Sequence, residues 1–181
     1  MDQNSGIPVA KWLEDADEKE IADILYQYGE EKRSRKIAKI IKEKQQQTPI
    51  QTTKQLADII ALVVPAKKHK HPATRSFQAL RIFINQELES LKILLADIHD
   101  ILNIGGRLVV LSFHSLEDRI VKQFINKNSK AEILPKGLPI MEKDIKKAIF
   151  KNLGKFIASK KELECNIRAR SAVGRVCQKI S

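Results

Sequence analysis

Residues 112–115, Ser-Phe-His-Ser, gather two hydroxyls and one imidazole in a single short run. Groups of these types can transfer protons, act as nucleophiles or orient a polar substrate by hydrogen bonding. The run follows residues 108–111, an unbroken apolar stretch of β-favouring type, which predicts an interior strand covered on both faces of its sheet. Because sites in open α/β sheets lie beyond the carboxyl ends of strands, Ser112, His114 and Ser115 are the candidate catalytic residues.

A helix is predicted directly after this run. Ser115 stands three residues before Asp118, which is the spacing of a capping box, and the helix would cover residues 116–125. His114 then has a second interpretation, in which it only fills the corner between strand and helix. A hydrolase is disfavoured, because the sequence has no Gly-x-Ser-x-Gly elbow and a serine next to a histidine rarely reaches hydrogen-bond geometry.

Charge is distributed unevenly along the chain. Its 181 residues contain 33 Lys and Arg against 22 Asp and Glu, a net charge of +11 that favours a polyanionic partner. Residues 1–31 carry nine acids and two bases, whereas residues 32–54 carry eight bases and one acid. The spacing of Ile37, Ile40 and Ile41 predicts a helix over residues 31–44 with a basic outer side. Such a helix either binds a polyanion or is simply solvated.

The rest of the first half is predicted to be helical. Acidic residues from position 15 open a helix that Gly29 ends, and Thr52 with Gln55 has the spacing of a capping box for a helix stopped by Pro65. A basic loop over residues 67–72 leads to a single long helix over residues 74–103. Later elements are a short helix at 141–150 and strands at 153–158 and 171–179. Phe77, Phe83 and Phe113 are expected in the core, and His99 at the surface.

Several classes of site are disfavoured. Cys165 and Cys177 show neither a zinc-ligand spacing nor a disulfide framework. His69, His71 and His114 are more often solvated or structural than metal ligands, so no metal site is predicted. Residues 1–7 do not resemble a signal peptide, and no run approaches the roughly 18 apolar residues of a membrane span. A cytoplasmic protein without a membrane partner is expected.

The strand at residues 108–111 poses a physical difficulty. An interior strand needs neighbours for its backbone groups, yet no strand is predicted before it in the chain. No glycine-rich turn between a strand and a helix is present to hold a nucleotide or cofactor either. The sequence therefore has the pattern of the second half of a sheet.

Four segments carry a resemblance to a known family. They are residues 71–82, HPATRSFQALRI, residues 105–108, GGRL, residues 112–122, SFHSLEDRIVK, and residues 168–172, RARSA. Together with Met1-Asp2, Trp12-Leu13 and residues 28–31, YGEE, they resemble the bacterial S-adenosylmethionine-dependent methyltransferases that modify N4 of a cytosine in 16S ribosomal RNA, of the small-subunit methyltransferase H type. The resemblance covers essentially the whole chain, but only the C-terminal portion of the family's proteins.

The resemblance implies an α/β fold. The chain would be the C-terminal part of a Rossmann-like methyltransferase sheet, with about three strands in a mixed sheet, plus an inserted all-helical domain. The domains would be residues 1–65, the helical insertion that recognises substrate, and residues 66–181, the C-terminal part of the methyltransferase domain. The last strand would lie antiparallel between the other two. The N-terminal half of the sheet would be missing, and with it the main motifs that bind S-adenosylmethionine, so no cofactor-binding residue is assigned.

By the same resemblance, the chain would methylate 16S rRNA in the small ribosomal subunit and would be incomplete and inactive alone. The alternatives are one half of a split enzyme, which works with a separate N-terminal half, and a non-enzymatic basic RNA-binding remnant. Ile167 and Gly174 depart from the family pattern, and a glycine within a strand is expected to weaken the final hairpin. The candidate RNA-binding residues are Lys32, Arg35, Lys36, Lys39, His71, Arg75, Arg81, Asn85, Arg168 and Arg170.

Overall fold

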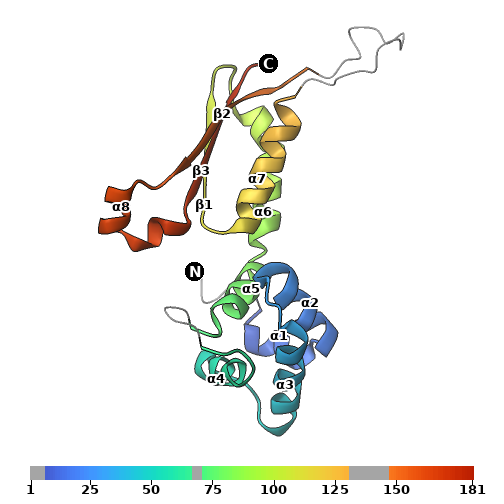
Figure 1. Cartoon of the computed structure of the whole chain (residues 1–181). Helices are drawn as coiled ribbons and strands as arrows, with labels where there is room; N and C mark the ends of the chain where they lie inside the picture. The colour runs from blue at the N-terminus through green and yellow to red at the C-terminus, as the bar shows by residue number, and fades with distance from the viewer. Residues whose placement is uncertain (1–6, 67–70, 131–146) are drawn as a thin grey trace, which may run out of the picture. The chain divides into compact units, whose positions relative to one another are not determined.

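The computed structural model describes residues 7–66, 71–130 and 147–181, in two compact units, Met1–Glu87 and Leu88–Ser181. The first unit is helical and the second combines a three-stranded sheet with helices, so the fold is α/β (Figure 1). The predicted domain boundary at residue 65 marks the end of the helical domain that the family inserts in its sheet. It differs in kind from the division into compact units after Glu87, and it stays a prediction. The basic loop at 67–72 and the short helix at 141–150 lie largely outside the described residues, although Phe150 belongs to a strand.

The helices of the first unit follow local sequence signals closely. The Thr52–Gln55 capping box is confirmed, with the Gln55 amide donating to the Thr52 hydroxyl at 3.2 Å and the Thr52 amide to the Gln55 side chain at 2.9 Å. One helix was not predicted, because it has only seven residues. The helices are α1 (Val9–Asp15), α2 (Glu18–Gly29), α3 (Ser34–Gln47), α4 (Thr53–Val63) and α5 (Thr74–Ile84).

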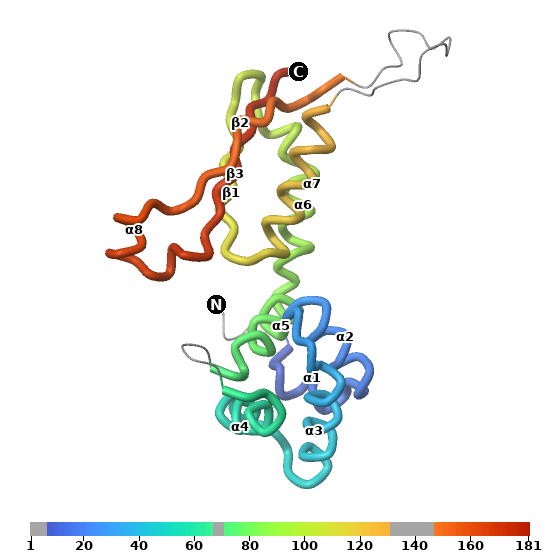
Figure 2. The backbone as a smooth tube through the Cα atoms, viewed as in Figure 1, coloured from blue at the N-terminus to red at the C-terminus, as the bar shows by residue number. Residues whose placement is uncertain are grey.

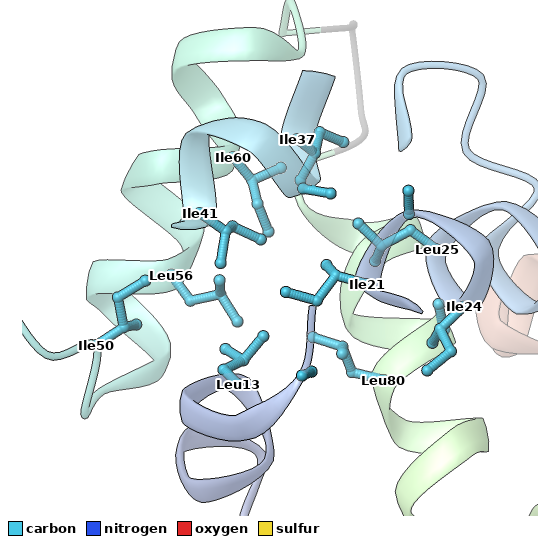
Figure 3. Close-up of a cluster of buried hydrophobic side chains, with 14 of the residues drawn as sticks. Leu13, Ile21, Ile24, Leu25, Ile37, Ile41, Ile50, Leu56, Ile60 and Leu80 are labelled. Carbon is cyan, nitrogen blue, oxygen red and sulfur yellow. The ribbon is translucent and has the colours of Figure 1, made fainter. Parts of the chain in front are cut away.

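The core of the first unit forms where the apolar stripes of these helices meet. Side chains spaced by three or four residues along each helix converge on one cluster, so each helix buries one face and leaves the other to solvent. Figure 3 shows the labelled side chains, which point toward one another: Leu13, Ile21, Ile24, Leu25, Ile37, Ile41, Ile50, Leu56, Ile60 and Leu80.

Gly29 brings α2 and α5 into close contact. A Cβ atom at Gly29 would lie 2.7 Å from the carbonyl oxygen of Arg75 and 3.1 Å from the Cβ of Ala79. The next residue, Glu30, adopts a left-handed conformation with φ 49° and ends α2. Its carbonyl accepts a hydrogen bond from the Arg75 guanidinium at 3.1 Å. Gly29 therefore serves as much for helix packing as for helix termination.

The prediction of one long helix over residues 74–103 was wrong. The helix breaks after α5, and α6 (Glu87–Ile101) follows Gln86, which has the left-handed φ of 51°. Arg81 forms a bidentate ion pair with Glu87 at 2.9 and 3.0 Å, and Asn85 donates to Glu87 at 3.2 Å. Residues six apart lie on different sides of a continuous helix, so these contacts require the break. The apolar spacing runs through it without a glycine or proline, which is why the sequence did not reveal it.

The second unit is built around a sheet in the order β1-β3-β2. Its strands are β1 (Arg107–Ser112), β2 (Phe150–Ile157) and β3 (Val173–Lys179), and both neighbouring pairs are antiparallel. The prediction that the last strand lies antiparallel between the other two is confirmed. Figure 2 traces the backbone of the chain through the three strands. A mixed sheet is not seen among the described strands, because parallel pairing would need another strand beside β1.

Among the described residues, helices cover one face of this sheet and leave the other open. Leu108, Val110 and Cys177 pack with residues of α6 and of α7 (Ser115–Asn128). On the opposite face, Val109, Leu111 and Phe156 are 66%, 58% and 58% exposed. The expectation that β1 is covered on both faces is therefore wrong for the described residues, and Phe113, expected in the core, is 55% exposed. The unbroken apolar run indicated a strand whose two faces are both buried. Both helices, α6 and α7, pack against the same face of the sheet, so the other face has no helix on it among the described residues.

We predict that Gly29→Ala destabilises the first unit. The added methyl group meets backbone rather than a movable side chain, and such overpacking costs about 1–3 kcal/mol. The helix propensity gained by replacing glycine with alanine is at most about 1 kcal/mol and offsets only part of this cost. Urea unfolding followed by helical circular dichroism measures the change. An unchanged or higher free energy of unfolding would contradict the close approach of α2 and α5.

The opposite sign is predicted for Gly174→Ala. A Cβ atom there would meet Phe156 at 3.7 Å and Leu111 at 4.0 Å, which are ordinary contact distances, and Gly174 has no left-handed φ. Glycine inside a strand costs roughly 0.5–1 kcal/mol relative to alanine, so the variant should unfold at a higher temperature. This variant is also the matched control for Gly29→Ala. A lower melting temperature would argue against the observed room beside β3.

Candidate nucleic-acid interface

The outer side of α3 and the turn before it form the α3 basic surface, which we define as Lys32, Arg35, Lys36 and Lys39. All four side chains are exposed, because Ile37, Ala38 and Ile41 take the buried side of the helix. Among the ion pairs of the described residues, only Lys39 of this group takes part, at 3.9 Å from the exposed carboxylate of Glu43. Such a pair is weak in water. The surface therefore presents positive charge that the first unit itself hardly neutralises.

Two other cations of the same segment stabilise the fold instead. The Arg33 guanidinium donates to the carbonyl of Val63 at the end of α4. The Lys42 ammonium donates to the carbonyl of Ala16, just after α1, at 2.7 Å. Cations at the carboxyl ends of helices satisfy carbonyls that lack partners within the helix. Neither residue was among the predicted RNA-binding candidates.

The remaining candidates in the first unit have contacts of their own. His71 accepts a hydrogen bond from the amide of Ala73 at 3.2 Å, just before α5 begins. Arg75 joins α5 to the end of α2, whereas Arg81 and Asn85 both contact Glu87. These contacts give each side chain a structural role. All four side chains are exposed, so RNA could still reach them, and their role as RNA contacts stays a prediction.

At the carboxyl end of β1, the helix cap differs by one residue from the prediction. His114, not Ser115, is the N-cap of α7, and its Nδ1 atom accepts a hydrogen bond from the amide of Glu117 at 3.3 Å. The Glu117 carboxylate accepts in return from the amides of Phe113 and His114, at 2.9 and 3.4 Å. Imidazole is an uncommon N-cap, which explains why the Ser115–Asp118 spacing misled the prediction.

The cap fixes which nitrogen of His114 can hold a proton. Because Nδ1 accepts from an amide, the ring proton must lie on Nε2, which is 3.2 Å from Oε1 of Glu117 but not aligned as a hydrogen bond. Partial burial raises the pKa of Glu117, but the His114 imidazole beside it and the hydrogen bonds from the Phe113 and His114 amides outweigh this effect and lower the pKa overall. His114 as placed orders the strand-to-helix turn and has no nitrogen available as a base.

The two serines differ in their surroundings. Ser112 is 1% exposed and its hydroxyl has no hydrogen-bond partner within the described part of the chain. Ser115 is exposed in the first turn of α7. In the strand register, Ser112 at the end of β1 pairs with Val173 at the start of β3. The turn that carries Arg168 and Arg170 comes just before β3, so it lies at the carboxyl end of β1. Both arginines are exposed, and neither forms an ion pair with Glu162 or Glu164.

An ion pair between β3 and α7 was missed by the sequence analysis. Arg175 binds Asp118 through two hydrogen bonds of 2.6 and 2.9 Å, with side chains 14% and 22% exposed. The hydrogen bonds from the guanidinium lower the pKa of Asp118, and the same pair raises the pKa of Arg175. The partners are 57 residues apart, so no local spacing could reveal them.

The turn between β1 and α7 is occupied largely by its own hydrogen bonds. The amides of Phe113 and His114 are bound by the Glu117 side chain and that of Glu117 by the His114 side chain, and Ser112 is buried. No glycine-rich turn lies between β1 and α7, where residues 113 and 114 are phenylalanine and histidine. At this end of the sheet the structure shows an ordered strand-to-helix turn and, at the start of β3 beside it, the segment with the exposed Arg168 and Arg170.

Comparison with known proteins identifies the family. The profile described as the MraW methylase family matches residues 1–180. The chain belongs to the MraW methylase family. Among similar curated proteins, the ribosomal RNA small subunit methyltransferase H of Ruthia magnifica is 55% identical over 179 residues, and that of Thioalkalivibrio sulfidiphilus is 49% identical over 183 residues. These alignments include 99% and 100% of this MraW-family chain but 58% of each relative.

The resemblance stated from the sequence is thus confirmed. In this MraW-family chain, no helix among residues 7–66, 71–130 and 147–181 is long and apolar enough to cross a membrane.

We predict that Asp118→Asn destabilises the second unit in a pH-dependent manner. Hydrogen bonds to a charged group contribute about 2 kcal/mol, which the variant should lose at neutral pH. Because the folded pKa of Asp118 lies below the unfolded value of about 3.9, the stabilisation is complete above that pH and disappears as the pH falls through the folded pKa. Urea unfolding at pH 7 and at pH 3 should show the two proteins converging in acid.

The matched control is Glu89→Gln, which removes an exposed carboxylate 2.6 Å from Lys92 on α6. Exposed pairs contribute little, so this variant should resemble the unmodified protein at both pH values. A difference for Asp118→Asn that is as large at pH 3 as at pH 7 would exclude the ion pair as its cause.

Proposed function

We propose that this chain is the C-terminal portion of a ribosomal RNA methyltransferase that modifies N4 of a cytosine in 16S rRNA of the small subunit. S-adenosylmethionine is the methyl donor expected from the family, and the cytoplasm is the expected location. The match of residues 1–180 to the MraW methylase family carries this proposal. The name printed for the relatives, ribosomal RNA small subunit methyltransferase H, indicates the RNA substrate.

The role proposed for this chain is to bind and position RNA. An exocyclic amine inside a base-paired stack cannot be reached, so the target base must be held out of it. Contacts to the phosphate backbone fix the register of the RNA without reading its sequence. The α3 basic surface in one unit and Arg168 with Arg170 in the other are the groups that suit such contacts.

Methyl transfer itself is proposed to require more than this chain. The relatives are longer, and 58% of their length is matched here. The uncovered face of the sheet, with Val109 and Leu111 exposed, and the outer edge of β1 both lack partners among the described residues. Further strands and helices from the unmatched part of the family's length would pair this edge and cover this face. They would also supply the cofactor site that β1 and α7 do not form.

A non-enzymatic RNA-binding function is the alternative. The observation that favours it is that α3 carries exposed cations, whereas the amides at the turn between β1 and α7 bind side chains of that turn. A chain of this kind would keep affinity for RNA and lose the chemistry.

Calorimetric titration with S-adenosylmethionine separates these functions. We expect no binding by the chain alone, and binding after a separately produced N-terminal half of a complete relative is added. Methylation of 16S rRNA by that mixture would support the split-enzyme form of the proposal. Binding by the chain alone would contradict the division of labour proposed here, and no binding or methylation by the mixture would favour the non-enzymatic alternative.

Reversing two charges on the α3 basic surface tests the RNA-binding role. Lys36→Glu with Lys39→Glu should weaken binding of a 16S rRNA fragment about tenfold at low salt and flatten the salt dependence, because fewer counterions are released from the RNA. Fluorescence anisotropy over a salt series measures both quantities. The control is Lys11→Glu with Lys19→Glu, which makes the same charge change on exposed residues of α1 and α2. Equal affinities for the two variants would exclude α3 as the RNA contact.

A further inference from the structure

A hollow of about 580 Å³ lies at the corner between α2 and α3, entirely within the first unit. One wall is the outer side of α2, where Tyr26 and Asp23 stand. The other is the start of α3 and the turn before it, which contribute Lys32, Arg35 and Lys36. A volume of this size falls in the range of small-ligand sites, roughly 300–1,000 Å³.

Tyr26 is exposed in a way that packing does not explain. Its side chain is 62% accessible, whereas Ile21, Ile24 and Leu25 on the same helix are buried. The neighbouring Tyr28 has a partner, since its ring stacks with that of Phe83 at 6.4 Å between centroids. Tyr26 therefore lines the hollow and leaves much of its surface accessible to a ligand.

The opposite wall is strongly basic. Lys32, Arg35 and Lys36 are exposed, and Asp23 is the one carboxylate that lines the hollow. Arg33, at the same corner, is held by its hydrogen bond to the Val63 carbonyl, which anchors the turn before α3. An aromatic face opposite several cations offers stacking to a base and charge to a phosphate at once.

We propose that this hollow binds one unpaired nucleotide of RNA, with its base stacked on Tyr26 and its phosphate among Lys32, Arg35 and Lys36. The inference rests on the proposed RNA-binding function and adds a requirement to it, namely that the RNA at this point is single-stranded. A paired base has no free face for Tyr26, whereas the cations attract any phosphate backbone. The stacking site thus favours single-stranded over double-stranded RNA, whereas the α3 basic surface attracts the phosphates of both.

The test compares two substitutions of Tyr26 in the full chain. Tyr26→Phe keeps the aromatic face, and Tyr26→Leu keeps an apolar side chain of good helix propensity without it. The probes are a fluorescein-labelled 12-nucleotide single strand of cytidine and uridine and a 12-base-pair RNA duplex. Loss of one base–aromatic stack should weaken single-strand binding about tenfold in Tyr26→Leu and leave duplex binding unchanged. Tyr26→Phe should bind both probes as the unmodified protein does.

Three results would overturn the nucleotide site. They are equal single-strand affinity for Tyr26→Leu and the unmodified protein, an equal loss on both probes, and an equal loss for Tyr26→Phe and Tyr26→Leu. The salt dependence in Tyr26→Leu should be unchanged, because no charge is removed.

The failure of this site is distinguishable from the failure of the proposed function. If Lys36→Glu with Lys39→Glu weakens binding but Tyr26→Leu does not, the α3 basic surface binds phosphates and the stacking site is wrong. If neither changes the affinity, RNA binding by this face is wrong altogether. Displacement of the single strand by heparin with equal ease from the unmodified protein and from Tyr26→Leu would identify a general polyanion surface and overturn the nucleotide site.

Discussion

The second unit depends on β3, because within the described sheet β1 and β2 each hydrogen-bond to β3 and not to each other. Two side chains of the same strand also fix the helices. Arg175 binds Asp118 on α7, and the Lys179 ammonium donates to the carbonyls of His99 and Leu102 at the end of α6, at 2.8 and 3.0 Å. One strand thus sets the sheet order, the position of α6 and that of α7.

The cations of the basic segment in the first unit have two roles, of which one is structural and the other leaves charge exposed at the surface. Arg33 and Lys42 donate to carbonyls at the ends of α4 and α1, and this stabilises the packing of α3. The cations of the α3 basic surface project outward from a helix whose inner side is formed mainly by Ile37, Ala38 and Ile41. Their charges are therefore held on one side by the packing of the bundle. An exposed tyrosine beside them gives this side a chemistry that charge alone would not provide.

Local signals in the sequence were sufficient wherever neighbouring residues decide the structure. The capping box of Thr52 and Gln55 depends on atoms three residues apart, and it formed as expected. At α7 the same spacing rule predicted a cap by Ser115 and Asp118, whereas the observed N-cap is His114. Nothing in the local sequence indicates that an imidazole will cap a helix. Asp118 instead pairs with Arg175, a contact between distant residues. Likewise, the break at Gln86 is set by contacts to Glu87 and not by a helix-breaking residue.

The sequence alone determined the helical first half, the basic side of α3, the antiparallel place of the last strand and the family. The first two features follow from periodicity and charge, the family from motifs, and the place of the last strand from the resemblance to that family. The tertiary structure decided that β1 is covered on one face only, that Gly29 is a packing contact and that Tyr26 faces a basic hollow. Each of these depends on which elements come together in space, and residue types along the chain do not specify that pairing.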